Sequence, residues 1–166
     1  MRKTLIYFPI MACFFICCNL KDKKETNRFY NYSRINYIYR LPIIEPYEIT
    51  SPDNGASWSI AFKNFPPPTH GVQFLTKIGV KDSVFIVYSP RDLSFSSDHP
   101  EVWVVVNTRK DERVFTTENE YKRYLLTQGI NEIKLYDINT VFREFEEKVI
   151  LPPEWPEQPS ENEKRN

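Results

Sequence analysis

The chain has few of the residues from which the commonest catalytic and cofactor sites are built. Its three cysteines stand at positions 13, 17 and 18, and no cysteine follows them. This excludes a disulfide framework or a thiolate metal site in the rest of the chain. Only four glycines are present, and neither G-x-G-x-x-G nor G-x-x-x-x-G-K can be written. The glycine-rich loops that hold nucleotide phosphates are therefore excluded as well.

The chain also lacks an excess of charge of either sign, since it contains 22 basic and 22 acidic residues. Residues 1–17 hold Arg2, Lys3 and no acid, so that without them acidic residues exceed basic ones by two. No strong positive field is left to attract the phosphates of nucleic acid. We therefore expect no nucleic-acid partner, and nothing in the composition calls for a cofactor.

No apolar run is long enough to span a membrane, yet the chain begins with a short one. Arg2 and Lys3 precede residues 5–16, which are uncharged and mostly aliphatic or aromatic. A membrane-spanning helix needs roughly 20 apolar residues, whereas the hydrophobic region of a secretory signal is shorter. The run ends at Cys17 and Cys18 without a small-residue cleavage site of the A-x-A kind. We interpret residues 1–17 as an export signal.

The stretch Phe15-Ile16-Cys17-Cys18 resembles the lipobox of bacterial lipoproteins. The resemblance implies cleavage before a cysteine that carries fatty acyl chains such as palmitate. Cys18 is the preferred attachment site because Cys17 then fills the small position before it, and Cys17 is the alternative. Two or more acyl chains give a stable anchor, whereas one gives only marginal binding. We expect an exported protein anchored to a bacterial membrane, at the outer membrane or cell surface in a Gram-negative cell. A plain signal or an uncleaved anchor is the other interpretation.

The rest of the chain divides into a tether, one domain and a tail. Residues 18–29 are polar and charged, which is typical of a flexible tether. Residues 30–151 suit a single domain with its own core. Residues 152–166 contain four prolines and many charged residues, which indicates a disordered tail. Trp155 is the residue of that tail that could still be buried.

Alternating side chains and turn signals predict the strands of the domain. Asn54-Gly55 is a turn signal between two runs rich in aromatic and β-branched residues. Residues 102–106 are apolar on both faces, as in a central strand. The predicted strands cover residues 35–39, 47–50, 58–62, 72–78, 84–88 and 102–106, with short runs at 114–115 and 133–136.

Two helices are predicted on the C-terminal side. Thr117 and Glu120 form a capping box, and Gly129 fits the position after the helix end. Asp137 is the expected N-cap of the second helix, in which apolar residues recur at i, i+3, i+4 and i+7. These residues are Ile138, Val141, Phe142, Phe145 and Val149. The prediction is an α+β domain, with an antiparallel sheet of about five to seven strands and two C-terminal helices.

Residues 102–130 resemble the C-terminal part of some small bacterial lipoproteins of unknown activity. In their pattern a strand, a T-K-x turn and a short strand precede a helix of the kind E-x-E-[FY]-x-x-x-L and a Gly-Ile pair. The matching residues are Thr108, Lys110, Glu118, Glu120, Tyr121, Leu125, Gly129 and Ile130. The resemblance implies this fold and an anchored location, and it implies no activity.

The residue types of an active site are present, but nothing positions them. His70 and His99 each stand beside a turn residue, and Asp98 and Glu101 could complete only a weak metal site. Serines share a loop with His99, yet no G-x-S-x-G elbow is present. No acidic pair is singled out for glycoside hydrolysis. We expect no metal, and the alternative function is a hydrolase of cell wall or glycan with a loop site around 89–101.

Residues 28–40 alternate aromatic side chains with Arg, Asn and Ser. Tyr and Arg are favoured at recognition surfaces because they combine contact area with polar groups. In a single strand, Tyr37 and Tyr39 share one face, while Arg34 and Arg40 lie on the other, which we expect to be the exposed face. These four residues form the candidate binding surface. The other interpretation is an ordinary edge strand with alternate residues in the core.

These features favour a lipid-anchored envelope protein without catalytic activity that acts by binding another protein or a glycan. An immunity or inhibitor protein is one form of this hypothesis, and an accessory of an envelope complex is another. The membrane is a further expected partner, through the lipid anchor.

Overall fold

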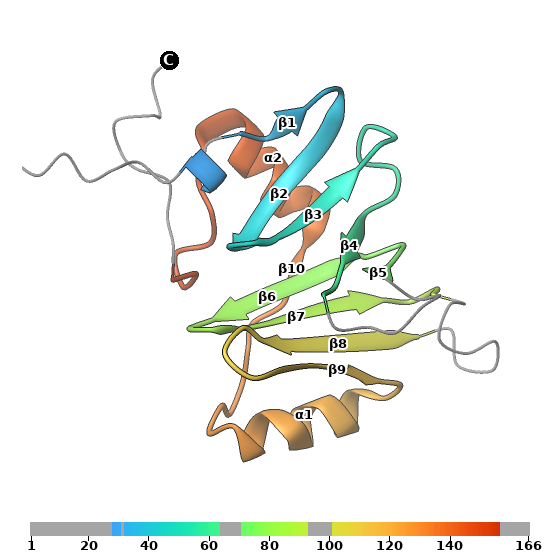
Figure 1. Ribbon diagram of the computed structural model, residues 1–166, viewed down its shortest axis with the longest axis vertical. Coiled ribbons are helices and arrows are strands. Elements are labelled where there is room, and N and C mark those ends of the chain that lie inside the picture. Colours follow the sequence, from blue (N-terminus) through green and yellow to red (C-terminus); the bar gives the residue numbers. More distant parts are fainter. Residues whose placement is uncertain (1–27, 31, 64–70, 93–100, 157–166) are drawn as a thin grey trace, which may run out of the picture.

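The computed structural model describes residues 28–30, 32–63, 71–92 and 101–156. These residues form two five-stranded antiparallel sheets and two α-helices, so the predicted α+β class is confirmed. The strands are divided between two sheets rather than joined in one. The first sheet lies above the second along the long axis, with α2 (Ile138–Lys148) behind the first sheet and α1 (Glu118–Thr127) at the far end (Figure 1).

In the first sheet, strands that are consecutive in the sequence also lie side by side, as is usual for short connections. Its order is β1-β2-β3-β4-β5. The strands are β1 (Arg34–Ile35), β2 (Ile38–Ile44), β3 (Tyr47–Ser51), β4 (Ser59–Ala61) and β5 (Gly71–Val72), and the 3-10 helix η1 (Arg28–Tyr30) precedes them. Asn54 and Gly55 have φ values of 57° and 87° between β3 and β4, as expected for a turn signal.

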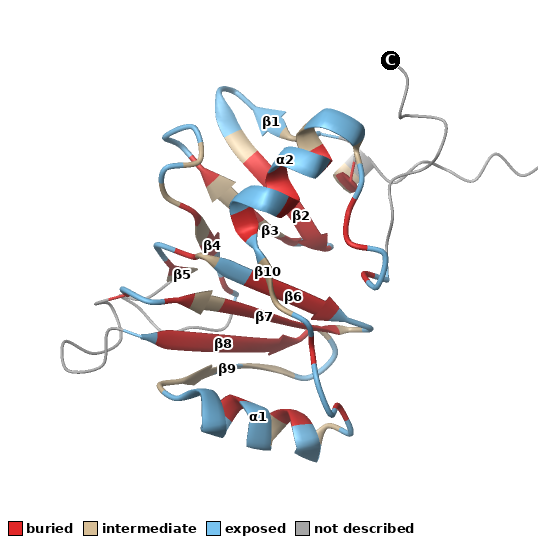
Figure 2. Cartoon of the chain, turned by 180° about the vertical axis from the view of Figure 1, so that it is seen from behind, coloured by how far each residue is buried: buried red, intermediate tan, exposed pale blue. Residues whose placement is uncertain are grey.

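The second sheet has the order β10-β6-β7-β8-β9. Its strands are β6 (Lys77–Lys81), β7 (Val84–Ser89), β8 (Val102–Asn107), β9 (Asp111–Phe115) and β10 (Tyr136–Asp137). Every residue of β8 is buried, which agrees with its prediction as a central strand. Figure 2 shows buried residues along β6, β7 and β8, and also in β2 and α2. The second sheet is therefore the middle layer of the molecule.

Alternation along β8 divides the core into two clusters. Val102, Val104 and Val106 belong to the larger cluster, which both sheets and α2 share. Trp103 and Val105 belong to the smaller cluster, which α1 covers. The Trp103 ring stacks on Tyr121 of α1, with centroids 4.5 Å apart. Because both faces of the sheet are covered, its strands are apolar on both sides.

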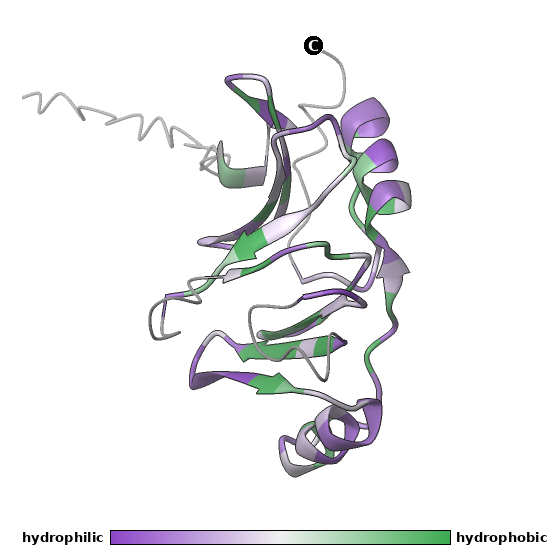
Figure 3. Ribbon diagram, turned by 90° about the vertical axis from the view of Figure 1, so that its right-hand side faces the viewer, coloured by the Kyte–Doolittle hydropathy of each residue, from purple (hydrophilic) through white to green (hydrophobic). Residues whose placement is uncertain are grey.

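Both helices begin where the caps predict, and α1 also ends as predicted, whereas α2 ends at Lys148 with Val149 as its C-cap. The Thr117 hydroxyl accepts the Glu120 N–H at 3.3 Å, and the Asp137 carboxylate accepts the Thr140 N–H at 2.8 Å. Gly129 has a φ of 75°, which closes α1 through a left-handed residue. Figure 3 shows the hydrophilic outer surface of α2. Among the described residues, no helix is both long and apolar enough to cross a membrane.

The C-terminal boundary of the domain differs from the prediction, because residues 152–156 belong to the folded unit. The Trp155 side chain is 2% exposed and joins the larger core cluster together with Leu151. The backbone N–H of Trp155 donates to the Pro152 carbonyl at 3.0 Å, and Glu154 accepts a hydrogen bond from Tyr136. The burial of the Trp155 ring therefore keeps residues 152–156 on the domain, although their composition predicted a disordered tail. Residues 157–166 lie outside the described part of the chain.

Candidate functional site

The candidate surface at residues 28–40 is a helical turn followed by a β-hairpin, not one continuous strand. Ile35 of β1 pairs with Ile38 of β2, so only two residues, Asn36 and Tyr37, form the loop. Their φ values are 49° and 71°. Two positive values at the centre of a two-residue loop define a type I′ turn, whose twist matches that of the flanking strands. The hairpin therefore reverses the chain in the middle of the predicted strand.

Most of the large hydrophobic residues that are exposed in the described part of the chain lie in this hairpin or just before it. Tyr37 is 95% exposed, and Tyr32, Ile35 and Ile38 are 56%, 48% and 39% exposed. We call these four side chains the hairpin surface. They are four of the seven large hydrophobic residues that are exposed in the described part of the chain. Single exposed hydrophobic residues are common, whereas a local group of them indicates an interaction site.

Tyr37 occupies a backbone position that favours glycine. A left-handed conformation costs a residue with a Cβ about 1 kcal/mol, and Asn-Gly is the preferred pair for this turn. Because the ring is 95% exposed, no core packing offsets that cost. Backbone strain at an exposed side chain is an observation from which a functional role can be inferred.

Arg34, a predicted site residue, is exposed and fastens the hairpin to α2. Its Nε donates to the Glu146 carboxylate at 2.9 Å, and its guanidinium lies 4.6 Å above the Tyr39 ring. The bond with Glu146 raises the pKa of Arg34. Tyr39, also a predicted site residue, stacks on Phe142 with centroids 4.7 Å apart. Tyr39 is therefore a packing residue, and Arg34 orients the hairpin beside the helix.

Arg40 was predicted to be exposed, and this prediction is wrong. The side chain is 4% exposed and pairs with Glu48. Its Nη1 donates to the carbonyls of Phe29 at 2.7 Å and Tyr32 at 3.1 Å. The guanidinium also lies 4.5 Å above the Phe29 ring. Phe29 and Tyr32 cover the face of the sheet that the alternation had left open, and Arg40 binds their carbonyls.

The alternative loop site around residues 89–101 lies mostly outside the described residues, as do His70, His99 and the cysteines. In the described part of that loop, the buried carboxylate of Asp92 accepts the Gln73 N–H at 2.7 Å. Burial and a bond with Glu101 raise the pKa of Tyr88. No group of three or more His, Cys, Asp or Glu residues that could hold a metal occurs within the described ranges. The hydrolase site stays a prediction.

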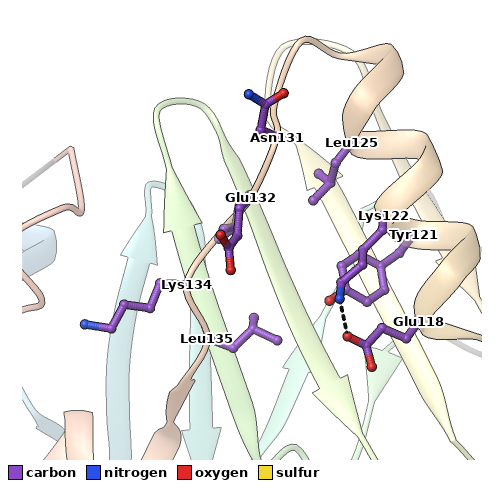
Figure 4. Close-up of a pocket in the computed structure, with 9 residues that line it drawn as sticks. Glu118, Tyr121, Lys122, Leu125, Asn131, Glu132, Lys134 and Leu135 are labelled. Atoms are coloured by element: carbon purple, nitrogen blue, oxygen red, sulfur yellow. Dashed lines mark ion pairs between the residues drawn. The ribbon is translucent and has the colours of Figure 1, made fainter.

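A pocket of about 220 Å³ lies at the other end of the molecule, between α1 and residues 131–135. Its lining residues are Glu118, Tyr121, Lys122, Leu125, Asn131, Glu132, Ile133, Lys134 and Leu135, of which Figure 4 labels eight. Pockets for small-molecule substrates usually measure about 300–1,000 Å³. The residues include no nucleophile paired with a base, so we find no support for catalysis in this pocket.

Sequence reasoning therefore singled out this segment but predicted one strand where the structure has a hairpin. Tyr37 was a candidate residue but was placed on the face expected to be covered, and it is exposed, whereas Tyr32, Ile35 and Ile38 were not among the candidates. The signal that could have found the turn is Asn36, because Asn tolerates a left-handed conformation better than most residues. Comparison with protein-family models, with curated proteins and with solved structures finds no match to the chain.

Proposed function

We propose that this protein is a lipid-anchored component of a bacterial envelope that binds a macromolecular partner and has no catalytic activity of its own. The hairpin surface is the contact site. The main support for the proposal is that Tyr37 is almost fully exposed and has a left-handed backbone conformation. The resemblance of residues 15–18 to a lipobox supports the anchored location.

The chemistry of the hairpin suits the centre of a protein interface. Tyr is enriched among the residues that contribute most to binding, because its ring offers a large contact area at a low entropic cost. Arg34 fastens the base of the hairpin to Glu146, and Tyr39 stacks on α2. The hairpin is therefore held in place before a partner arrives, and little ordering entropy is lost on binding.

The anchor leads to a direct test. The change Cys18→Ser removes the preferred acceptor sulfur, so we expect the protein to leave the membrane fraction and to lose labelling by a palmitate analogue. Fractionation of cells and metabolic labelling measure this. Cys13→Ser is the matched control, because it removes a cysteine inside the apolar run and should change neither result. A Cys18→Ser protein that still takes up label and stays in the membrane fraction would contradict the assignment, and Cys17 is then tested.

The binding role is tested by Tyr37→Gly in the anchored protein. Glycine removes the ring and relieves the left-handed strain, so stability should rise by about 1 kcal/mol, while partner recovery should fall at least tenfold, as expected for a binding hot spot. Affinity purification from cells and a thermal melt are the measurements.

Asp82→Gly is the matched control for this substitution. Asp82 also has a positive φ, of 53°, and is exposed in the turn between β6 and β7. Its replacement should leave partner recovery unchanged. If Tyr37→Gly recovers the same partner as the wild type in equal amount, the hairpin surface is not the contact site.

A further inference from the structure

The hairpin surface is assembled from two parts of the chain that are held in different ways. Tyr32 precedes β1, whereas Ile35, Tyr37 and Ile38 lie in the β1–β2 hairpin. η1 and this hairpin lie at the same end of the molecule (Figure 1). A partner that contacts all four side chains needs both parts in fixed positions, since ordering either part on binding would cost conformational entropy.

The hairpin part is fixed by contacts with α2. Arg34 donates to the Glu146 carboxylate at 2.9 Å. Tyr39 stacks on Phe142 with centroids 4.7 Å apart. These contacts join β1 and β2 to the helix and do not include Tyr32, so the position of Tyr32 depends on other bonds.

Tyr32 is attached to the first sheet through the side chain of Arg40. The Arg40 Nη1 donates to the Tyr32 carbonyl at 3.1 Å and to the Phe29 carbonyl at 2.7 Å. The neighbouring Ser33 carbonyl is instead bound by the backbone N–H of Arg40, at 2.7 Å. The bond with Ser33 therefore does not need the guanidinium, whereas the bond with Tyr32 does.

The guanidinium of Arg40 is itself held from several sides. The residue is 4% exposed, its Nε pairs with Glu48 of β3, and the group lies 4.5 Å above the Phe29 ring. A guanidinium carries its donors in fixed directions within one plane. Because these contacts fix that plane, the carbonyls that it binds are fixed as well.

We propose that Arg40 is a positioning residue of the hairpin surface, which holds Tyr32 in place beside the hairpin without touching the partner. The inference rests on the proposed function of that surface. Loss of the guanidinium releases Tyr32, while the contacts with α2 keep the hairpin itself in place. Binding of the macromolecular partner therefore depends on the buried Arg40 side chain, and it does so through Tyr32.

The test uses a benzophenone amino acid at position 37 of the anchored full chain. The measured quantity is the yield of the crosslinked product in living cells, relative to the amount of chain in the membrane fraction. Arg40→Ala and Tyr32→Ala should each lower this yield by about fivefold or more, as for other residues that matter for binding. The double variant should lower it no further, because the two residues act as one unit.

Leu125→Ala is the control for a general loss of stability. Leu125 is 2% exposed in the smaller core cluster, so its truncation leaves a cavity under α1 and destabilises the protein. The hairpin surface belongs to the other sheet, and the yield from position 37 should not change. This control separates positioning of Tyr32 from a merely structural effect of Arg40.

NMR relaxation of the ¹⁵N-labelled full chain in detergent micelles tests the positioning without a partner. Arg40→Ala should increase the fast motion of the Tyr32 amide and leave that of the Tyr37 amide unchanged. Unchanged motion of Tyr32, a full yield from Arg40→Ala, additive losses in the double variant or an equal loss from Leu125→Ala would overturn the role of Arg40. If the otherwise unchanged chain gives no product from position 37, the hairpin is not the contact site, so the two failures are distinguishable.

Discussion

Replacing Trp155 with alanine is expected to lower the free energy of unfolding by about 3–5 kcal/mol, the usual loss for a buried tryptophan. The ring is 2% exposed within the core cluster that joins the two sheets. For a domain of this size the thermal midpoint should fall by roughly 10–20 °C. Truncation after Leu151 removes the same ring and should cause a loss of similar size. Differential scanning calorimetry measures both changes.

The control for Trp155 is an exposed apolar residue of the same domain. Leu126 on α1 is 59% exposed, so Leu126→Ala should change stability by less than about 0.5 kcal/mol. Truncation after Pro156 keeps Trp155 and controls for the shortening of the chain. A truncation after Leu151 that melts with the full chain would show that the C-terminal segment does not dock on the core.

Arg40→Ala should lower the free energy of unfolding by about 2–3 kcal/mol. The substitution leaves the carbonyls of Phe29 and Tyr32 without their donor and leaves Glu48 without its ion pair. Removing one partner of a fully buried pair costs about 3–5 kcal/mol, and the value is smaller here because the Glu48 side chain is 35% exposed. The loss should be accompanied by faster hydrogen exchange at the amides of Phe29 and Tyr30, which the side chain holds in place.

Arg34→Ala is the matched comparison, since Arg34 also pairs with a glutamate but its side chain is 56% exposed. Exposed ion pairs contribute about 0–1 kcal/mol, so chemical denaturation should separate the two arginines clearly. Equal losses from both substitutions would mean that Arg40 is no more buried in solution than Arg34, and the packing of Phe29 and Tyr32 on Arg40 would have to be revised.

Local signals predicted the parts of the fold that depend on neighbouring residues. Thr117 and Glu120 located the start of α1, and Asp137 located the start of α2, because a cap acts within one turn of its helix. The apolar run of β8 correctly indicated a strand covered on both faces. These features can be predicted without knowing how the rest of the chain folds.

The features that were missed depend on contacts between residues far apart in the sequence. The division into two sheets is decided by which strands meet, and alternation along one strand does not contain that information. Arg40 is buried because Phe29 and Tyr32 lie against it. The hairpin was missed because its turn carries Tyr37 where the preferred sequence has glycine, and that mismatch now supports its role in binding.

Photo-crosslinking from position 37 tests the central claim most directly. A benzophenone amino acid in place of Tyr37 keeps an aromatic side chain at the tip of the hairpin, and the same amino acid in place of Asp82 marks an exposed turn of the second sheet. On illumination of living cells, we expect a discrete crosslinked product of higher mass from position 37 and none from position 82. No product from position 37, or the same products from both positions, would contradict the assignment of the hairpin as the binding surface.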